Sequence, residues 1–410
     1  MWKNIYLVLV CGILVGCGNS SSKNRVTGKL LLEMSSQEVK NKLISNGWED
    51  FGNSKIYGYK AYKISYVTKD EKDKNVNVSG LFVIPTEVDN KIKEDGFSIV
   101  SYGHGTNSLN ENAPTTYTEK HKELFEPAII FSSLAGFATL QADYIGYGDS
   151  KGHYHPYVMK KSLANASIDL IDAVKKFAKR NSIKLNDKLF VTGYSEGGYT
   201  AMATLQELEK RGISVSATAP LAGDYDLSYE AEVMFGTSGE NIVELEYTSL
   251  YLSFATLAYT KVYDKNITSV INSPYAQHIE KLFDKEHSFE QIESVLPSKI
   301  LGENGLMRED FIDDYQNNKN NWLKKALKEN SVDNWKPKTP LHIVHCEGDN
   351  QSPYLLAQKT YNQMIYNGST QVELITLDTE QAENEKWDHD DCFPPSLIYT
   401  FLWFKKIRDQ

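Results

Sequence analysis

Residues 189–198 read Leu189-Phe190-Val191-Thr192-Gly193-Tyr194-Ser195-Glu196-Gly197-Gly198. The first four residues have the pattern of a buried strand, and the segment Gly198–Lys210 has the pattern of a helix. Ser195 therefore lies in a sharp turn between a strand and a helix, where small residues at Gly193 and Gly197 let the two backbones approach. A serine in this position stands on a helix N-terminus, whose free N–H groups favour developing negative charge. We therefore predict Ser195 as a nucleophile.

Strand-like and helical segments alternate on both sides of this turn. An antiparallel hairpin is predicted over Tyr57–Val67 and Val76–Ile84, because charged and turn-forming residues separate the two runs. The other predicted strands are Phe97–Tyr102, Phe137–Ala142, Lys188–Thr192, Val215–Leu221, Leu341–His345 and Val372–Leu377. The predicted helices are Ser35–Ser45, Val158–Lys179, Gly198–Lys210, Ser352–Asn367 and Pro394–Ile407. The alternation predicts an α/β fold with a mostly parallel central sheet flanked by helices.

The alternation stops between residues 225 and 336. This segment is rich in Tyr, Glu and Asn and has a mostly helical pattern. A helical insertion between two strands of one sheet predicts a lid or cap, with a purely structural decoration as the alternative. Its segment Leu250–Tyr259 is a candidate lining for an acyl pocket, or a helix in the core of the lid.

A serine hydroxyl needs a base that takes its proton, and that base needs a partner that orients it. His389 follows the last predicted strand and is expected in the loop before the final helix. Asp349 follows the strand Leu341–His345 and is the predicted orienting acid. Three other carboxylates compete with it for this role: Glu347, Asp224 and Asp226.

A glycine-containing run, Tyr102-Gly103-His104-Gly105-Thr106, follows another predicted strand. It is expected to supply one N–H of an oxyanion hole, with Thr106 as the donor, and Glu196 is expected to supply the second. His104 is interpreted as a buried structural residue. The cluster Asp388-His389-Asp390-Asp391 is weighed as a metal site, but adjacent residues rarely converge on one ion. Neither a metal nor a cofactor is expected.

Two cysteines flank the predicted acid and base. Cys346 lies three residues before Asp349, and Cys392 lies three residues after His389. If these loops meet, the two Cα atoms fall within the separation of about 4.4–6.8 Å that a disulfide needs. A bridge that clamps the two loops is one hypothesis, and two unpaired thiols are the other.

Taken together, these motifs resemble the α/β-hydrolase superfamily and, within it, the secretory lipase-like branch. The resemblance covers the chain from about residue 60 to its C-terminus, and implies hydrolysis of carboxylic esters under a helical lid. It also implies a structural role for Asp143. The motifs are Tyr102–Thr106, Asp143-Tyr144-Ile145-Gly146-Tyr147-Gly148-Asp149-Ser150, His155-Pro156-Tyr157, Gly193–Gly198 and the loops of Asp349 and His389. The sequence departs from the pattern at Ser352-Pro353, where Val-Pro is commoner, and in the long acidic loop before His389.

The first residues have the pattern of an export signal. Met1-Trp2-Lys3 is followed by the apolar run Ile5–Val15, which is shorter than the roughly 20 residues of a membrane-spanning helix. The ending Leu14-Val15-Gly16-Cys17 resembles a bacterial lipobox, which implies a lipid on Cys17; an ordinary signal peptide is the alternative. The expected organisation is a signal at 1–16, a flexible tether at 17–28, a core at 29–224 and 337–410, and a lid at 225–336. The expected location is the bacterial cell envelope, outside the cytoplasm.

The composition narrows the possible partners. The chain has 54 acidic and 44 basic residues, which argues against a nucleic-acid partner. The leading hypothesis is an esterase or lipase acting on a small-molecule, lipid or glycan ester. An exported serine peptidase is an alternative, because lid residues such as Glu230, Glu232, Glu240, Glu244 and Glu246 could receive a free amino terminus. A non-catalytic surface-binding lipoprotein is the third hypothesis.

Overall fold

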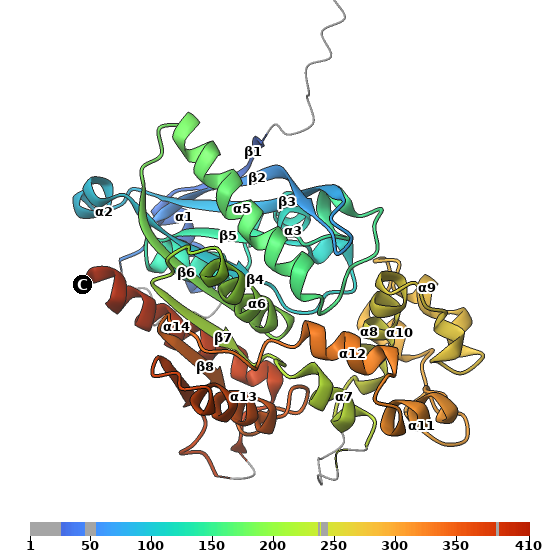
Figure 1. Cartoon of the computed structure of the whole chain (residues 1–410). Coiled ribbons are helices and arrows are strands. Elements are labelled where there is room, and N and C mark those ends of the chain that lie inside the picture. The colour runs from blue at the N-terminus through green and yellow to red at the C-terminus, as the bar shows by residue number, and fades with distance from the viewer. Residues whose placement is uncertain (1–25, 46–54, 237, 239–244, 383–384) are drawn as a thin grey trace, which may run out of the picture.

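A computed structural model describes residues 26–45, 55–236, 238, 245–382 and 385–410. Their strands form one nine-stranded sheet in the order β1-β2-β3-β5-β4-β6-β7-β8-β9 (Figure 1). The strands are β1 (Thr27–Met34), β2 (Gly58–Lys69), β3 (Asn75–Thr86), β4 (Phe97–Gly103), β5 (Ala138–Ala142), β6 (Leu185–Tyr194), β7 (Ala217–Leu221), β8 (Leu341–His345) and β9 (Val372–Thr376). The first three pair antiparallel, and β3 also pairs antiparallel with β5. All pairs from β5 through β9 are parallel, which confirms the predicted fold class.

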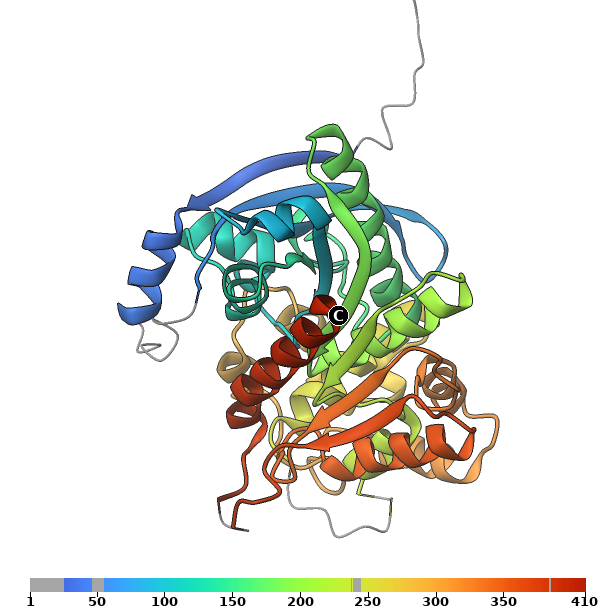
Figure 2. The same ribbon diagram turned by 90° about the vertical axis from the view of Figure 1, so that its left-hand side faces the viewer.

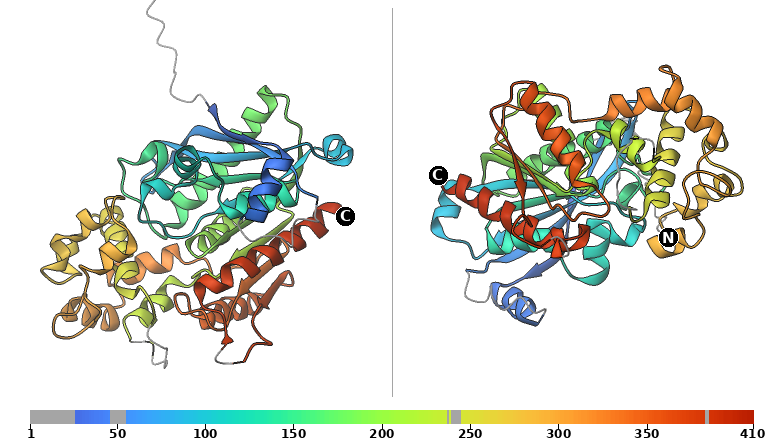
Figure 3. Two further views of the ribbon diagram at one scale, coloured as in Figure 1. Left: turned by 180° about the vertical axis from the view of Figure 1, so that it is seen from behind. Right: turned by 90° about the horizontal axis from the view of Figure 1, so that it is seen from below.

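Helices cover both faces of this sheet and enclose two apolar cores. On one face lie α5 (Lys160–Arg180), α6 (Glu196–Lys210) and α13 (Tyr354–Tyr366), whose apolar residues share one core with the lid. On the other face lie α1 (Ser36–Ser45), the π-helical turn η4 (Ile129–Leu134) and α14 (His389–Asp409). Figure 3 shows α14 running across this second face, and Figure 2 shows how strongly the sheet twists. The sheet thus lies between two packed layers of helices.

The lid, residues 225–336, connects β7 to β8 and is helical apart from one isolated bridge, Ile271 with Met307, among its described residues. It lies beyond the carboxyl ends of the parallel strands (Figure 1). Its helices are α7 (Leu227–Met234), α8 (Thr248–Val262), η6 (Ile267–Ser269), η7 (Tyr275–Gln277), α9 (Ile279–Leu282), α10 (Phe289–Glu293), α11 (Glu309–Asn317) and α12 (Trp322–Asn330).

Strand β1 corrects the predicted tether, which was expected to reach residue 28. The strand begins at Thr27 and pairs with β2 from Thr27–Ser65 to Met34–Tyr59. Its side chains are mostly exposed, so backbone pairing with the edge of the hairpin, and not burial of an apolar face, accounts for the strand. Gly28 lies over the ring of Phe177, where a Cβ atom would collide with the ring.

Several helices have no counterpart among the predictions. They are α2 (Asn90–Asp95), η3 (Asn110–Asn112), α3 (Pro114–His121), α4 (Glu126–Ala128), η4 and η5 (Gly148–Ser150). The final helix begins at His389, five residues before the predicted start at Pro394. The Asp388 side chain accepts a hydrogen bond from the N–H of Asp391 at 2.8 Å and so caps this earlier turn. No helix in the described ranges is long and apolar enough to span a membrane, and the predicted signal and Cys17 fall outside those ranges.

Candidate active site

Ser195 occupies the turn between β6 and α6 in a strained backbone conformation, with φ 58° and ψ −122°. Such values are uncommon for a residue with a side chain, and they persist only where the surroundings enforce them. Here the neighbouring glycines do so. A Cβ on Gly197 would collide with the carbonyl oxygen of Gly103, and one on Gly193 would lie 2.6 Å from the same oxygen. The tight packing of β4, β6 and α6 therefore depends on both glycines.

His389 is held by Asp349. The imidazole Nδ1 lies 2.8 Å from Asp349 Oδ2, and both residues are buried. Asp349 Oδ1 accepts the N–H groups of Gln351 at 3.0 Å and Ser352 at 2.8 Å, which fixes the carboxylate. Because Nδ1 is engaged by the carboxylate, Nε2 is the ring nitrogen left for a substrate or a nucleophile. His389 is the first residue of α14, not a loop residue as predicted.

The charge of Asp349 dominates the electrostatics of this pair. Burial alone would lower the pKa of His389, but attraction to Asp349 and their hydrogen bond outweigh burial and raise it. Burial would likewise raise the pKa of Asp349, yet His389 and His345 hold that pKa well below the usual carboxyl range. The arrangement favours a negative carboxylate beside a ring that accepts a proton readily.

The three competing carboxylates have other partners. Asp224 accepts a hydrogen bond from the Ser352 hydroxyl, and Asp226 caps α7 by accepting the N–H of Tyr229 at 3.2 Å. Glu347 pairs with Lys386 at the protein surface. Asp349 is thus the carboxylate that contacts the His389 ring.

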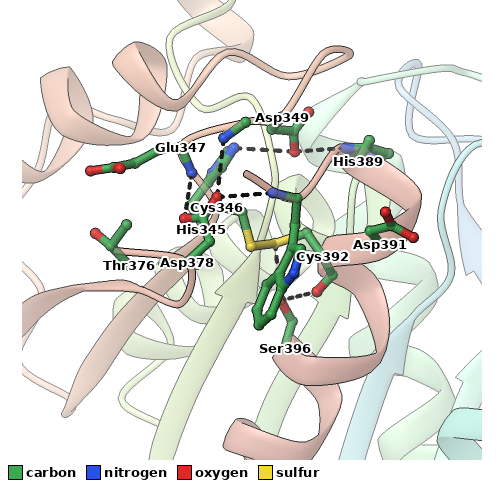
Figure 4. The surroundings of a disulfide bond; sticks show 12 residues. His345, Cys346, Glu347, Asp349, Thr376, Asp378, His389, Asp391, Cys392 and Ser396 are labelled. Atoms are coloured by element: carbon green, nitrogen blue, oxygen red, sulfur yellow. Dashed lines mark hydrogen bonds and ion pairs between the residues drawn. A yellow bond between two sulfur atoms is a disulfide. The ribbon is translucent and has the colours of Figure 1, made fainter. Parts of the chain in front are cut away.

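Two further groups hold the Asp349 loop against the segment around His389 (Figure 4). Cys346 and Cys392 form a disulfide with a Cα–Cα separation of 6.0 Å. The buried carboxylate of Asp378 accepts the N–H groups of Glu347 and Gly348 from one loop and of Trp387 from the other. Within the Asp349 segment itself, His345 at the end of β8 places its Nε2 3.3 Å from Asp349 Oδ2, on the side away from His389.

The predicted oxyanion loop packs against Ser195. A Cβ placed on Gly105 would lie 3.5 Å from Ser195 Cβ. The backbone N–H groups of Gly105, Thr106 and Glu196 donate to no acceptor among the described residues, so they are free to receive a developing oxyanion. The Thr106 hydroxyl lies 3.1 Å from the hydroxyl of Tyr157.

The side chain of Glu196 is anchored by His155, a contact that the sequence pattern did not predict. Their buried side chains meet with Nε2 of His155 2.7 Å from Oε1 of Glu196. The other ring nitrogen, Nδ1, lies 2.9 Å from the carbonyl oxygen of Ile145. The contact anchors the side chain of the residue that is predicted to supply the second N–H of the oxyanion hole.

The two residues predicted to be structural differ in their surroundings. His104 stacks on Tyr144 with ring centroids 4.1 Å apart, but it is half-buried and lines the same cleft as Ser195, so it is not the fully buried residue that was predicted. Asp143 is buried and accepts three hydrogen bonds from Ser79 and Thr115. Within the described residues, no group of three or more His, Cys, Asp or Glu side chains is placed to hold a metal ion.

Ser195 and His389 both line a cleft of about 550 Å³, which is within the usual size of small-molecule sites. No hydrogen bond joins their side chains in the described part of the chain; such contacts often tighten only when substrate binds. The same two residues also line a small second cavity beneath α7. From the predicted acyl-pocket segment, Tyr251 lines both spaces, whereas Leu250, Leu257 and Tyr259 are buried in the lid core.

Comparison with known proteins agrees with this architecture. A model of the prolyl oligopeptidase family matches residues 125–264, less than half of the chain. A putative hydrolase from Legionella pneumophila superposes with a TM-score of 0.79 and 25% identity, covering 94% of this chain and 98% of that one. The rice cell wall degrading esterase LipA from Xanthomonas oryzae superposes with a TM-score of 0.76 and 24% identity, covering 94% of this chain and 97% of that one. Candida antarctica lipase A in its closed state superposes with a TM-score of 0.63 and 13% identity, covering 93% of this chain and 81% of that one. No curated protein sequence matches the chain.

The chain is a hydrolase of the α/β-hydrolase fold. In this hydrolase, two residues that hold the site together could not be recognised from the local sequence. His155 contacts Glu196 across 41 residues, and Asp378 contacts Glu347 across 31 residues. The motif His155-Pro156-Tyr157 marked one of them as part of a pattern, but not as the partner of Glu196.

Proposed function

We propose that this hydrolase cleaves carboxylic esters through a Ser195–His389–Asp349 triad. The observation that carries the proposal is the Asp349–His389 hydrogen bond of 2.8 Å beside a strained serine turn. Such a pair orients the imidazole and stabilises the positive charge that the ring acquires during catalysis. The esterase and lipase among the structural neighbours agree with an ester substrate.

The proposed reaction is acyl transfer in two stages. Ser195 Oγ forms a bond to the ester carbonyl carbon while its proton passes to His389 Nε2. The N–H of Glu196 and an N–H of the Gly105–Thr106 loop receive the oxyanion; the bond to the alcohol then breaks, and the alcohol takes the proton from His389. Water attacks the acyl-enzyme by the same route, and the acid leaves as Ser195 regains its proton.

The first test is hydrolysis of p-nitrophenyl esters of graded acyl length by the protein lacking residues 1–17. This form keeps β1 whole. A form cut at the end of the predicted tether, after Gly28, would lose Thr27 and Gly28 from this strand. Ser195→Ala should remove nearly all turnover and leave at most the roughly 10³–10⁴-fold over water that binding and the oxyanion site provide. Full activity in that variant would refute the assigned nucleophile.

A peptidase is the second candidate, and one cavity favours it. Asp224 and Glu230 line the small cavity beneath α7 together with Ser195 and His389. Its volume of about 20 Å³ admits a group the size of a water molecule or an ammonium. Burial, opposed by the Ser352 hydrogen bond and reinforced by Asp349, raises the pKa of Asp224 to about 6. Burial also raises the pKa of Glu230, which hydrogen-bonds Asp224.

Two half-buried acids that have no ion-pair partner among the described residues suit a substrate with a free amino group. Alanine p-nitroanilide and its N-acetyl derivative test this function directly, since only the first carries an ammonium. A peptidase of this kind would cleave the first compound and lose that preference in Glu230→Gln. Failure to cleave either amide, with ester cleavage intact, would leave the esterase alone. Glu240 and Glu244 from the predicted acidic set lie outside the described residues.

We further propose that the protein is exported and anchored by a lipid on Cys17. The disulfide between Cys346 and Cys392 supports an oxidising compartment, because such bonds rarely persist in the cytosol. Labelling of bacteria with radioactive palmitate should mark the full chain and leave Cys17→Ala unlabelled. Equal labelling of both proteins would refute the anchor.

A further inference from the structure

Aromatic side chains form much of the wall of the large cleft, whose volume is about 550 Å³. Phe125, Phe289 and Phe393 line it and are half-buried, so part of each side chain remains accessible. Tyr194 and Tyr251 also line it and are buried. A ligand in the cleft can therefore contact several rings at once.

Two exposed carboxylates line the same cleft. Glu126 follows Phe125 in the chain, and Asp390 follows His389. Neither carboxylate forms an ion pair with a basic side chain among the described residues. The described lining contains no lysine or arginine, and of its two histidines, His389 must be neutral to act as a base. The cleft therefore offers negative charge without a compensating cation.

The aromatic rings of the cleft also lack a cation from the protein itself. Elsewhere in the described part of the chain, basic side chains lie over aromatic rings, as Lys359 does over Tyr229 at 3.8 Å from the ring centroid. None of these pairs involves a ring that lines the cleft. The negative face of an aromatic ring attracts a cation within about 6 Å. Rings alone would accept any apolar group, but rings beside unpaired carboxylates favour a positively charged one.

The position of His389 indicates which part of an ester would meet these groups. In the proposed reaction, His389 gives its proton to the leaving alcohol, so the alcohol lies on the His389 side of the cleft. Asp390 is the next residue, and Phe393 lies one turn further along α14, on the same face as His389. The ring of Tyr194 lies 5.0 Å from the rings of both Phe393 and His389. The alcohol is thus flanked by one carboxylate and two aromatic rings.

We propose that this cleft selects esters whose alcohol carries a quaternary ammonium group. A quaternary ammonium has no N–H to donate, so aromatic faces and nearby negative charge, and not hydrogen bonds, recognise it. This inference rests on the proposed ester hydrolysis and adds the class of its leaving group. Phe393, Asp390 and Glu126 are specificity residues in this view, since they act on the ammonium and not on the reacting carbonyl.

A pair of esters of the same shape tests the proposal. Acetylcholine and 3,3-dimethylbutyl acetate differ in that a carbon atom replaces the charged nitrogen in the second. The wild-type protein should show at least about a tenfold higher kcat/KM for acetylcholine, since a cation–π contact and exposed charge contacts each contribute severalfold. Because both carboxylates are exposed, the preference should shrink in 1 M NaCl, where the screening length falls to about 3 Å.

Variants of the cleft should reduce this preference. Asp390→Asn and Glu126→Gln remove the two charges with little change of shape, and together they should reduce it about fivefold. Phe393→Leu keeps an apolar side chain without a ring and should reduce it about two- to fivefold. The ratio between the two esters cancels any effect of these changes on His389 itself.

Asp391→Asn is the matched control for the charge variants. Asp391 is also exposed in the first turn of α14, but it does not line the cleft. The control removes the same charge as Asp390→Asn and should keep the preference of the wild type. An equal loss in the control would overturn the proposal, because the effect would then reflect the overall charge of the protein.

Two further outcomes would overturn the proposal: equal kcat/KM values for the two acetates in the wild type, or an unchanged preference in Asp390→Asn/Glu126→Gln. If a variant misfolds or turnover is absent, calorimetric titration of the Ser195→Ala protein decides. That protein should bind acetylcholine more tightly than the neutral acetate, and equal or undetectable binding of both would overturn the proposal.

Hydrolysis of p-nitrophenyl acetate, which carries no positive charge, is scored separately. Its presence without a preference for acetylcholine refutes the cation site alone. Absence of hydrolysis of all three esters refutes the proposed ester hydrolysis.

Discussion

Removal of the Cys346–Cys392 bridge should weaken both the fold and the site. The bridge closes a loop with a sequence separation of 46 residues. Cross-linking a loop of that length removes about 13–14 cal/mol/K of chain entropy from the unfolded state, which corresponds to about 4 kcal/mol at 25 °C. For a chain of this size, that loss lowers the unfolding midpoint by about 5 °C.

The activity should fall as well, because the bridge joins the Asp349 loop to the first turn of α14, which presents His389. Asp378 still holds the two segments together through the N–H groups of Glu347, Gly348 and Trp387, so we expect a partial loss of kcat and not its disappearance. The variant Cys346→Ser/Cys392→Ser tests this expectation in urea unfolding and in ester hydrolysis.

Dithiothreitol serves as the internal control. It should destabilise the wild type to the level of the double variant and leave the variant itself unchanged. Two free thiols in the unfolded, unreduced protein that lacks residues 1–17, and so contains only Cys346 and Cys392, would refute the reasoning; so would equal stability of the two proteins without reductant.

Three other perturbations test the site. Because the base must be neutral and its pKa is raised, kcat/KM should fall as the pH drops through a value above about 6.5; a pH-independent rate from pH 5 to 8 would contradict the role of His389. Asp349→Asn should lower kcat by roughly 10⁴-fold with the fold intact by circular dichroism, and a loss below tenfold would point to another acid. His155→Leu leaves the Glu196 carboxylate buried without its partner and should cost about 3–5 kcal/mol in urea unfolding, whereas a stability within about 1 kcal/mol of wild type would show that the contact is dispensable.

The fold was predictable from sequence because its strands are short apolar runs separated by clear helical periodicity. Ser195 was accessible to the same reasoning, since strand, glycine, serine, glycine and helix follow one another within one segment. Strand β1 was not, because its exposed side chains carry no pattern and its pairing with β2 is a property of the folded chain.

The supports of the site escaped prediction for a related reason. His155 and Asp378 act through contacts with distant residues, and a lone histidine or aspartate gives no local sign of its partner. The predicted start of α14 was wrong because the helix extends back to His389, where the Asp388 side chain caps it by accepting one hydrogen bond. The choice of Asp349 over Asp224 likewise depends on a contact with His389 that only the folded chain displays.

The lid takes the place of an ordinary crossover between two neighbouring parallel strands, β7 and β8. Its return path is fastened to the core by Asn330, whose carbonyl accepts the Tyr199 hydroxyl and whose side chain accepts the N–H of Lys160. Val332 then donates its N–H to the carbonyl of Tyr225, which closes the base of the insertion. The insertion therefore leaves and re-enters the core at adjacent points, while its apolar side chains belong to the same core as those of α5, α6 and α13. A lid from a related enzyme, spliced at these two points, would have to restore that packing before the strands and the Ser195 turn could keep their places.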